Sequence, residues 1–128
     1  MITGRRAASY SRYTRHMLDE ASFRRESDNA LESLKQALIA AEDKSGSFEF
    51  EDNNGVMNII FENGSSKFVV TPNTPVRQIW ISAQSTSYKL EWSETASAFV
   101  LPKTGEALIL LMQRLLREHL SDPIITLR

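Results

Sequence analysis

The stretch Thr71-Pro72-Asn73-Thr74-Pro75-Val76-Arg77-Gln78-Ile79-Trp80-Ile81-Ser82 decides the fold, because it joins a turn with two prolines to a β-strand. Side chains alternate along a strand, which puts Gln78, Trp80 and Ser82 on one face. If the two isoleucines between them face the core, the tryptophan faces water between two hydrogen-bonding side chains. Tryptophan is enriched among the residues that contribute most to protein–protein binding. The strand therefore predicts a sheet face to which another molecule binds.

Further short segments with a two-residue period lie on both sides of this strand. The expected strands are residues 48–51, 56–61, 67–70, 76–82, 88–92 and 98–101. Turn-forming residues separate them, including Asp52-Asn53-Asn54-Gly55 and the Asn63-Gly64 pair, which favours a tight hairpin. Short turns between such segments are typical of antiparallel neighbours, so the segments predict a meander of about six strands.

Two segments with a helical period flank the meander. In residues 19–43, one stripe at spacings of three and four consists of Phe23, Ser27, Ala30, Leu31, Leu34, Leu38 and Ala41. A second apolar stripe follows Thr104, which we expect to cap the helix, and ends near Leu120 before Asp122-Pro123. Together these elements predict an α+β fold, a two-layer sandwich with two helices packed on one face of the antiparallel sheet. The other sheet face is expected in water.

The composition limits what this domain can be. The chain has 128 residues and no cysteine, so it suffices for one domain, and disulfides, thiolate metal sites and cysteine nucleophiles are excluded. It contains no run of about 18 apolar residues, so we expect no membrane span. His16 and His119 are far apart in the sequence, and a zinc site built on a histidine pair is not expected. We recognise no nucleophile–base pair and no glycine-rich phosphate loop.

Charge is distributed unevenly along the chain, although the overall balance is only −1. Residues 1–18 carry four arginines and no acid. Residues 19–52 carry ten acids against four bases, a balance of −6. An acidic segment that follows a basic one indicates a cation or a basic partner for the acidic part.

Three interpretations of residues 1–18 remain open: a flexible basic arm, the remnant of a mitochondrial presequence, or a stretch upstream of a natural start at Met17. We expect this segment to be a disordered basic tail. One domain then occupies residues 19–121, and the apolar residues 122–128 are expected to pack on the helices.

The segments described so far, in this order, resemble the frataxin family in its bacterial form. The likeness spans about residues 19–120. It is carried by Leu31 and Leu34, Gly55-Val56, Phe61-Glu62-Asn63-Gly64-Ser65, Pro75, Gln78-Ile79-Trp80-Ile81-Ser82, Trp92 and Thr104-Gly105-Glu106.

The resemblance implies a role in iron–sulfur cluster assembly, as an iron-binding adaptor that delivers iron to, or regulates, a cysteine desulfurase and its scaffold protein. Family members bind iron weakly through an acidic ridge on the first helix and first strand, and both Fe2+ and Fe3+ accept carboxylate oxygens. The ridge residues that carry over are Asp28, Glu32, Asp43, Glu49 and Glu51. Gln36, Ile39 and Ala40 stand where family ridges often have carboxylates, so this ridge is thinner.

The resemblance also implies that the desulfurase and scaffold bind the exposed sheet face. The residues that carry over are Asn73, Arg77, Gln78 and Trp80, and Lys89 lies near a basic position of the family. Trp92, by contrast, alternates with Tyr88 and Leu90 and is expected to be in the core. A monomer is expected, with oligomers driven by iron as a further state.

Two other functions compete with this one. The first is a ferroxidase, an enzyme that oxidises Fe2+ to Fe3+, which some family members are credited with being. It needs paired metal sites, and the thinned ridge argues against it. The second is a nucleic-acid-binding module that uses the basic tail and Trp80, but the domain is acidic, so no nucleic acid is expected. A cytoplasmic location is expected, or the mitochondrial matrix if residues 1–18 are a presequence.

Overall fold

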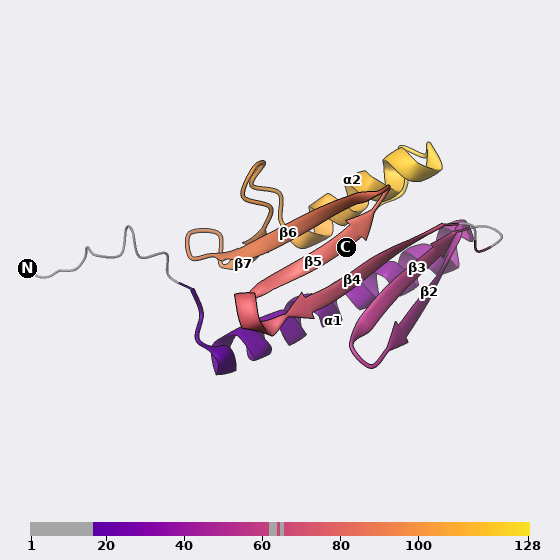
Figure 1. Cartoon of the computed structure of the whole chain (residues 1–128). Coiled ribbons are helices and arrows are strands. Elements are labelled where there is room, and N and C mark those ends of the chain that lie inside the picture. Colours follow the sequence, from indigo (N-terminus) through magenta and orange to yellow (C-terminus); the bar gives the residue numbers. More distant parts are fainter. Residues whose placement is uncertain (1–16, 62–63, 65) are drawn as a thin grey trace, which may run out of the picture.

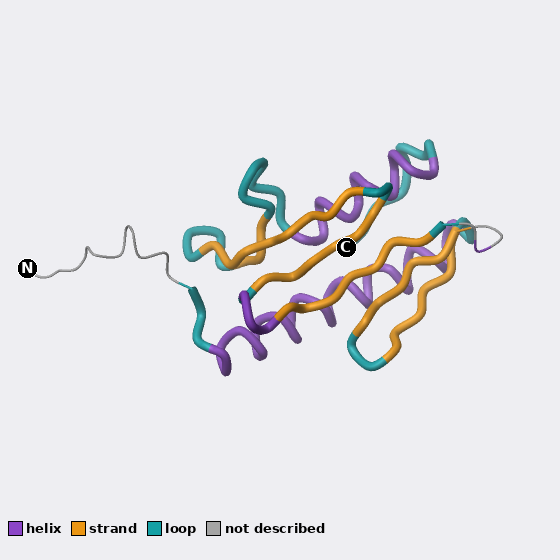
Figure 2. Tube along the Cα trace, viewed as in Figure 1, coloured by secondary structure: helices purple, strands orange, loops and turns teal. Residues whose placement is uncertain are grey.

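In the described part of the chain, a six-stranded sheet carries two α-helices on one of its faces, and Figure 1 shows this arrangement. The structure, a computed structural model, describes residues 17–61, 64 and 66–128. The expectations about residues 1–16 and about Asn63 therefore lie outside the described residues. Along the chain (Figure 2) the elements are α1 (Glu20–Ser45), β2 (Phe48–Asn53), β3 (Val56–Phe61), β4 (Lys67–Asn73), the short 3-10 helix η2 (Thr74–Val76), β5 (Gln78–Ala83), β6 (Thr86–Ser93), β7 (Ala98–Val100) and α2 (Leu108–Leu120).

The sheet is an antiparallel meander, as the sequence predicts. Its strand order is β2-β3-β4-β5-β6-β7, so every strand pairs with the next one in the chain. Two of the hairpins have two-residue loops with positive φ at both positions: Asn54-Gly55 (54° and 87°) and Gln84-Ser85 (53° and 63°). Such loops match the right-handed twist of the strands. The α+β two-layer prediction is confirmed.

Helix α1 begins and ends where side-chain and backbone chemistry favour it. The Asp19 carboxylate accepts a hydrogen bond from the Ser22 backbone N–H at 2.7 Å, and this bond lowers the pKa of Asp19. Gly46 ends the helix with a φ of 65°, and its N–H donates to the Glu42 carbonyl. The predicted stripe is largely buried, except that Ala30 and Leu31 are only half-buried.

The expectation that Thr104 caps α2 is wrong. The helix starts at Leu108, and Ala107 occupies the cap position without a side-chain hydrogen bond. Gly105 has a φ of 80°, which turns the chain away from a helical path, and the Glu106 N–H donates to Thr104 Oγ1 at 3.1 Å within this turn. Neither helix in the described part of the chain combines the length and apolar content that crossing a membrane needs.

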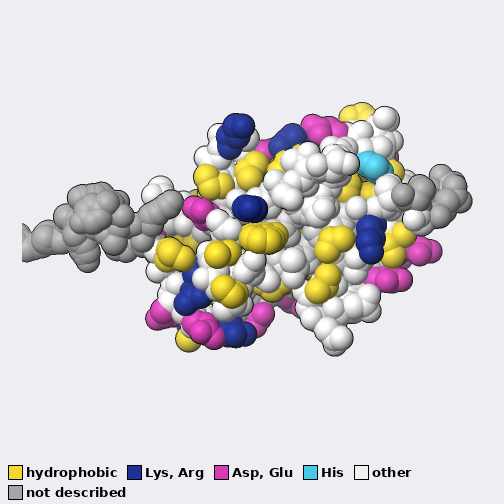
Figure 3. All heavy atoms as spheres, viewed as in Figure 1, with side chains coloured by type: hydrophobic (Ala, Val, Ile, Leu, Met, Phe, Trp, Pro, Cys, Tyr) yellow, Lys and Arg dark blue, Asp and Glu magenta, His cyan; other side chains and the backbone are white. Residues whose placement is uncertain are grey.

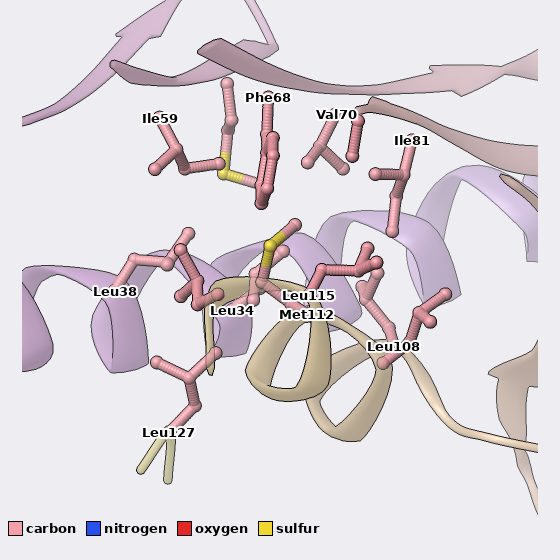
Figure 4. Packing of buried hydrophobic residues seen from close by; sticks show 14 of the residues in the cluster. Leu34, Leu38, Ile59, Phe68, Val70, Ile81, Leu108, Met112, Leu115 and Leu127 are labelled. Carbon is pink, nitrogen blue, oxygen red and sulfur yellow. The ribbon is translucent and has the colours of Figure 1, made fainter. Parts of the chain in front are cut away.

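The core lies between the sheet and the two helices, and Figure 4 shows side chains from both layers meeting there. The strands contribute Ile59, Phe68, Val70 and Ile81, and the helices contribute Leu34, Leu38, Leu108, Met112 and Leu115. Burial of these side chains is the main source of stability, at roughly 1.5–3 kcal/mol for each large apolar side chain.

The last residues of the chain lie against the helix layer. The side chain of Leu127 is 4% exposed and that of Ile124 is 81% exposed. The Arg117 Nε donates to the Ile125 carbonyl at 2.6 Å, and the Leu127 N–H donates to Gln113 Oε1 at 3.0 Å. Both donor–acceptor pairs join the tail to α2.

We predict that Leu127→Ala lowers the free energy of unfolding by about 2–4 kcal/mol, because it leaves a cavity in the core. Chemical denaturation followed by circular dichroism measures this. Ile124→Ala is the matched control in the same tail, and its effect should stay within about 0.5 kcal/mol. Equal effects of the two variants would show that the tail is not part of the core.

The turn before α2 is tied to the helix by an ion pair with two hydrogen bonds. Arg114 donates from Nε to Glu106 Oε2 at 2.7 Å and from Nη2 to Glu106 Oε1 at 2.9 Å. Arg114 also donates to Glu118 at 3.1 Å. The hydrogen bond from Arg114 is the main cause that lowers the pKa of Glu106. The ionised form of Glu106 is therefore favoured in the folded state.

Glu106→Gln should lower the free energy of unfolding at pH 7 by about 0.5–1 kcal/mol, since the pair is partly screened by solvent. The folded pKa of Glu106 lies below its unfolded value of about 4.3. Its contribution is therefore fully present above that pH and is lost as the pH falls through the folded pKa. Urea titrations at pH 7 and pH 3 measure the difference in the free energy of unfolding between the wild type and Glu106→Gln. Glu118→Gln is the control, and its effect should be smaller. If this difference in the free energy of unfolding were the same at pH 7 and pH 3, ionised Glu106 would not be the source of the stabilisation.

Candidate functional site

The sheet face that the helices leave uncovered is the candidate site. We use the name open face for the part of this surface formed by side chains that point away from the core on β3 to β7, namely Val56, Asn58, Ile60, Val69, Thr71, Asn73, Gln78, Trp80, Ser82, Lys89, Glu91 and Val100. Figure 3 shows hydrophobic side chains spread over this side of the molecule, with a few Lys or Arg side chains between them. A surface of this composition is typical of the central part of a protein–protein interface.

Trp80 lies within the open face, as the alternation of its strand predicts. Ile79 and Ile81 are 0% and 1% exposed, whereas the Trp80 side chain is only half-buried. The register places Trp80 opposite Thr71 on β4 and opposite Lys89 on β6. The strand therefore buries both isoleucines and presents the indole ring to the outside.

A chain of contacts fixes the indole ring. Trp80 Nε1 donates to Gln78 Oε1 at 2.7 Å, and Gln78 Nε2 donates in turn to Glu91 Oε2 at 3.0 Å. Lys89 Nζ lies 4.9 Å from the centroid of the ring, within the range of a cation–π interaction. Glu91 is not among the partner-binding residues that the sequence predicts. The alternation of Glu91 with Leu90 predicts that Glu91 lies on the open face. Its pairing with Gln78 depends on the register of β5 and β6, which the sequence does not show.

The other two predicted partner-binding residues flank this chain of contacts. Asn73 is half-buried at the end of β4 and pairs with Gln78 in the register. Arg77 has a φ of 56°, and its guanidinium donates to the Leu18 carbonyl at 3.1 Å and also to the Thr74 carbonyl. Arg77 thus holds the start of α1 against the η2 turn, which gives its side chain a structural role.

The five predicted iron ligands are exposed and do not converge. Asp28, Glu32 and Asp43 lie along α1, whereas Glu49 and Glu51 point to the sheet face opposite the helices. Across residues 17–61, 64 and 66–128, no group of three or more acidic or histidine side chains is close enough to hold a metal ion. The carboxylates can each bind a hard cation only loosely, with water as most of its ligands.

Two acids outside the predicted set of iron ligands, Glu42 and Asp52, lie where α1 meets β2, and both have structural contacts. Glu42 Oε2 accepts a hydrogen bond from the Phe50 N–H at 3.1 Å, which covers part of an open sheet edge. Asp52 forms an ion pair with Lys35 at 3.5 Å. Packing determines which turn of α1 lies beside β2. The sequence alone therefore does not predict these two contacts.

Trp92 differs from Trp80 in its surroundings. Its ring packs edge-to-face on Phe99, with the ring centroids 5.2 Å apart, and lies against the core on the helix side of the sheet. This agrees with its expected place in the core, although its side chain is half-buried rather than fully enclosed.

Comparison with known proteins agrees with the resemblance seen in the sequence. A family model described as a frataxin-like domain matches residues 16–122. The iron–sulfur cluster assembly protein CyaY of Azotobacter vinelandii is 25% identical over 107 residues, which cover 84% of this chain and 94% of that protein. The CyaY of Pseudomonas putida strain W619 is 28% identical over 108 residues, with the same coverage.

A solved structure of a frataxin from Psychromonas ingrahamii has the same fold, with a TM-score of 0.67 at 13% identity. It covers 86% of this chain, and the likeness extends over 96% of that protein. The residues matched by the family model span α1, α2 and the strands between them. From the extent of the family match we conclude that this chain belongs to the frataxin-like domain family.

Proposed function

We propose that this protein is an iron-binding adaptor of iron–sulfur cluster assembly, which docks on a cysteine desulfurase and its scaffold protein and delivers iron to them or regulates them. Relatives that match most of the chain are named iron–sulfur cluster assembly proteins. The observation that carries the proposal is the half-exposed Trp80, held by Gln78 and Lys89 on the sheet face that α1 and α2 leave uncovered.

An exposed, fixed tryptophan suits docking for physical reasons. The indole offers a large apolar area and loses little conformational freedom on binding, because its ring is already held in place. Residues of this type, surrounded by contacts that exclude water, contribute most to the free energy of association. The neutral and apolar neighbours Val69 and Thr71 can supply such a surrounding.

Iron is the cargo in this proposal, and the acids of α1 are suited to weak binding. Exposed carboxylates such as Glu32 and Asp43 can each offer oxygen ligands while the ion keeps most of its water. A carrier must release its ion, so loose binding fits delivery better than storage. No observation on the described residues favours a ferroxidase or a nucleic-acid-binding function, and we propose neither.

Trp80→Ala should abolish or strongly weaken binding to a purified cysteine desulfurase–scaffold complex while the protein stays folded. The expected loss is at least 30-fold, which corresponds to about 2 kcal/mol for a residue of this kind. Calorimetry measures the affinity and circular dichroism the fold. Leu110→Ala removes another exposed apolar side chain, 57% exposed on α2, and should bind like the wild type. Unchanged binding by the Trp80 variant would refute docking through the open face.

Replacing Glu32 by Gln and Asp43 by Asn together should weaken the binding of Fe2+ severalfold, because two oxygen anions are lost from α1. Anaerobic calorimetric titration with Fe2+ measures the affinity. Glu118→Gln, an acid on α2, is the control and should leave the titration unchanged. A titration that is the same for the double variant and the wild type would place the iron elsewhere.

A further inference from the structure

We infer that Glu91 is a positioning residue of the open face, which holds the Gln78 amide in one orientation and through it the ring of Trp80. This inference rests on the proposed docking function. Glu91 and Gln78 face each other across the β5–β6 pair, and Gln78 Nε2 donates to Glu91 Oε2 at 3.0 Å. No feature of the sequence alone assigned a role to Glu91.

The amide of Gln78 has a defined direction because its two ends bind opposite groups. Its oxygen accepts from Trp80 Nε1 at 2.7 Å, and its nitrogen donates to the Glu91 carboxylate. If the amide turned by half a rotation, its N–H groups would meet the indole N–H, and its oxygen would meet a negative charge. Both contacts are repulsive, so the Glu91 charge and the indole N–H select the same amide orientation.

The negative charge of Glu91 also strengthens the second hydrogen bond of the chain. A hydrogen bond to a charged acceptor is stronger than one between neutral groups, and linked hydrogen bonds polarise one another. The Gln78 oxygen therefore becomes a better acceptor for Trp80 Nε1, in keeping with their separation of 2.7 Å. The Gln78 amide therefore transmits the effect of Glu91 to the indole ring.

Strand β6 thus supplies two charged side chains with different tasks. Lys89 lies over the Trp80 ring, with its Nζ 4.9 Å from the centroid, and Glu91 fixes the edge of the ring through Gln78. A partner then meets a tryptophan whose ordering cost on binding is already reduced. Without Glu91, only the indole N–H selects the orientation of the Gln78 amide, so the acceptor of the indole is held less firmly.

The test compares Glu91→Ala and Glu91→Gln with the wild type in two measurements. Glu91→Ala should weaken binding to the purified desulfurase–scaffold complex by about three- to tenfold. Glu91→Gln should weaken it less, because a glutamine oxygen can still accept from Gln78. In the free protein, the Nε1–H resonance of Trp80 should shift and exchange faster with water in Glu91→Ala. Glu94→Ala, which removes an exposed acid from the turn after β6, is the control and should change neither quantity.

A double-mutant cycle with Gln78→Ala separates positioning from direct contact. If Glu91 acts through Gln78, Glu91→Ala should have no further effect on affinity once Gln78 is alanine. An equal loss of affinity in both backgrounds would overturn the inference, because it would mean that Glu91 meets the partner itself. An unchanged indole resonance in Glu91→Ala would also overturn it. If Trp80→Ala binds like the wild type, the proposed function fails, and the indole measurement on the free protein still decides the role of Glu91.

Discussion

The burial of one sheet face under two helices is the constraint on which the rest of this structure depends. Both helices lie on the same side, so every strand must send alternate side chains into the core and the others outward. On β5 this rule buries Ile79 and Ile81 almost completely and leaves Trp80 outside. The exposure of the tryptophan is thus a consequence of how the core is built, and its contacts with Gln78 and Lys89 follow from the antiparallel register.

Periodicity made much of this fold predictable, because hydrophobic spacing and turn residues are local signals. The order of elements, the meander and the direction of Trp80 all followed from such patterns. Contacts between distant segments did not. The start of α2 depended on the positive φ of Gly105, and the role of Arg77 depended on a carbonyl 59 residues earlier in the chain, that of Leu18. The Gln78–Glu91 pair required the exact register of two strands.

The two parts of the candidate surface differ in how well they are organised. On the open face, neighbouring strands fix Trp80 by hydrogen bonds and a cation–π contact. The acids of α1 are separate and exposed, and Glu32 accepts a hydrogen bond from Gln36 at 2.8 Å. Organised contacts suit the recognition of one partner, whereas separate carboxylates suit an ion that is bound and released. The structure therefore supports partner binding more strongly than iron storage.

The two tryptophans allow one direct measurement of the central claim, that the partner docks on the open face. Trp80 lies on that face, and Trp92 packs on Phe99 on the other side of the sheet. In protein labelled with fluorotryptophan, the fluorine resonance of each ring can be followed as a cysteine desulfurase–scaffold complex is added. Our account predicts that the Trp80 signal changes its chemical shift while that of Trp92 keeps its position. A shift of Trp92 with Trp80 unchanged would contradict it.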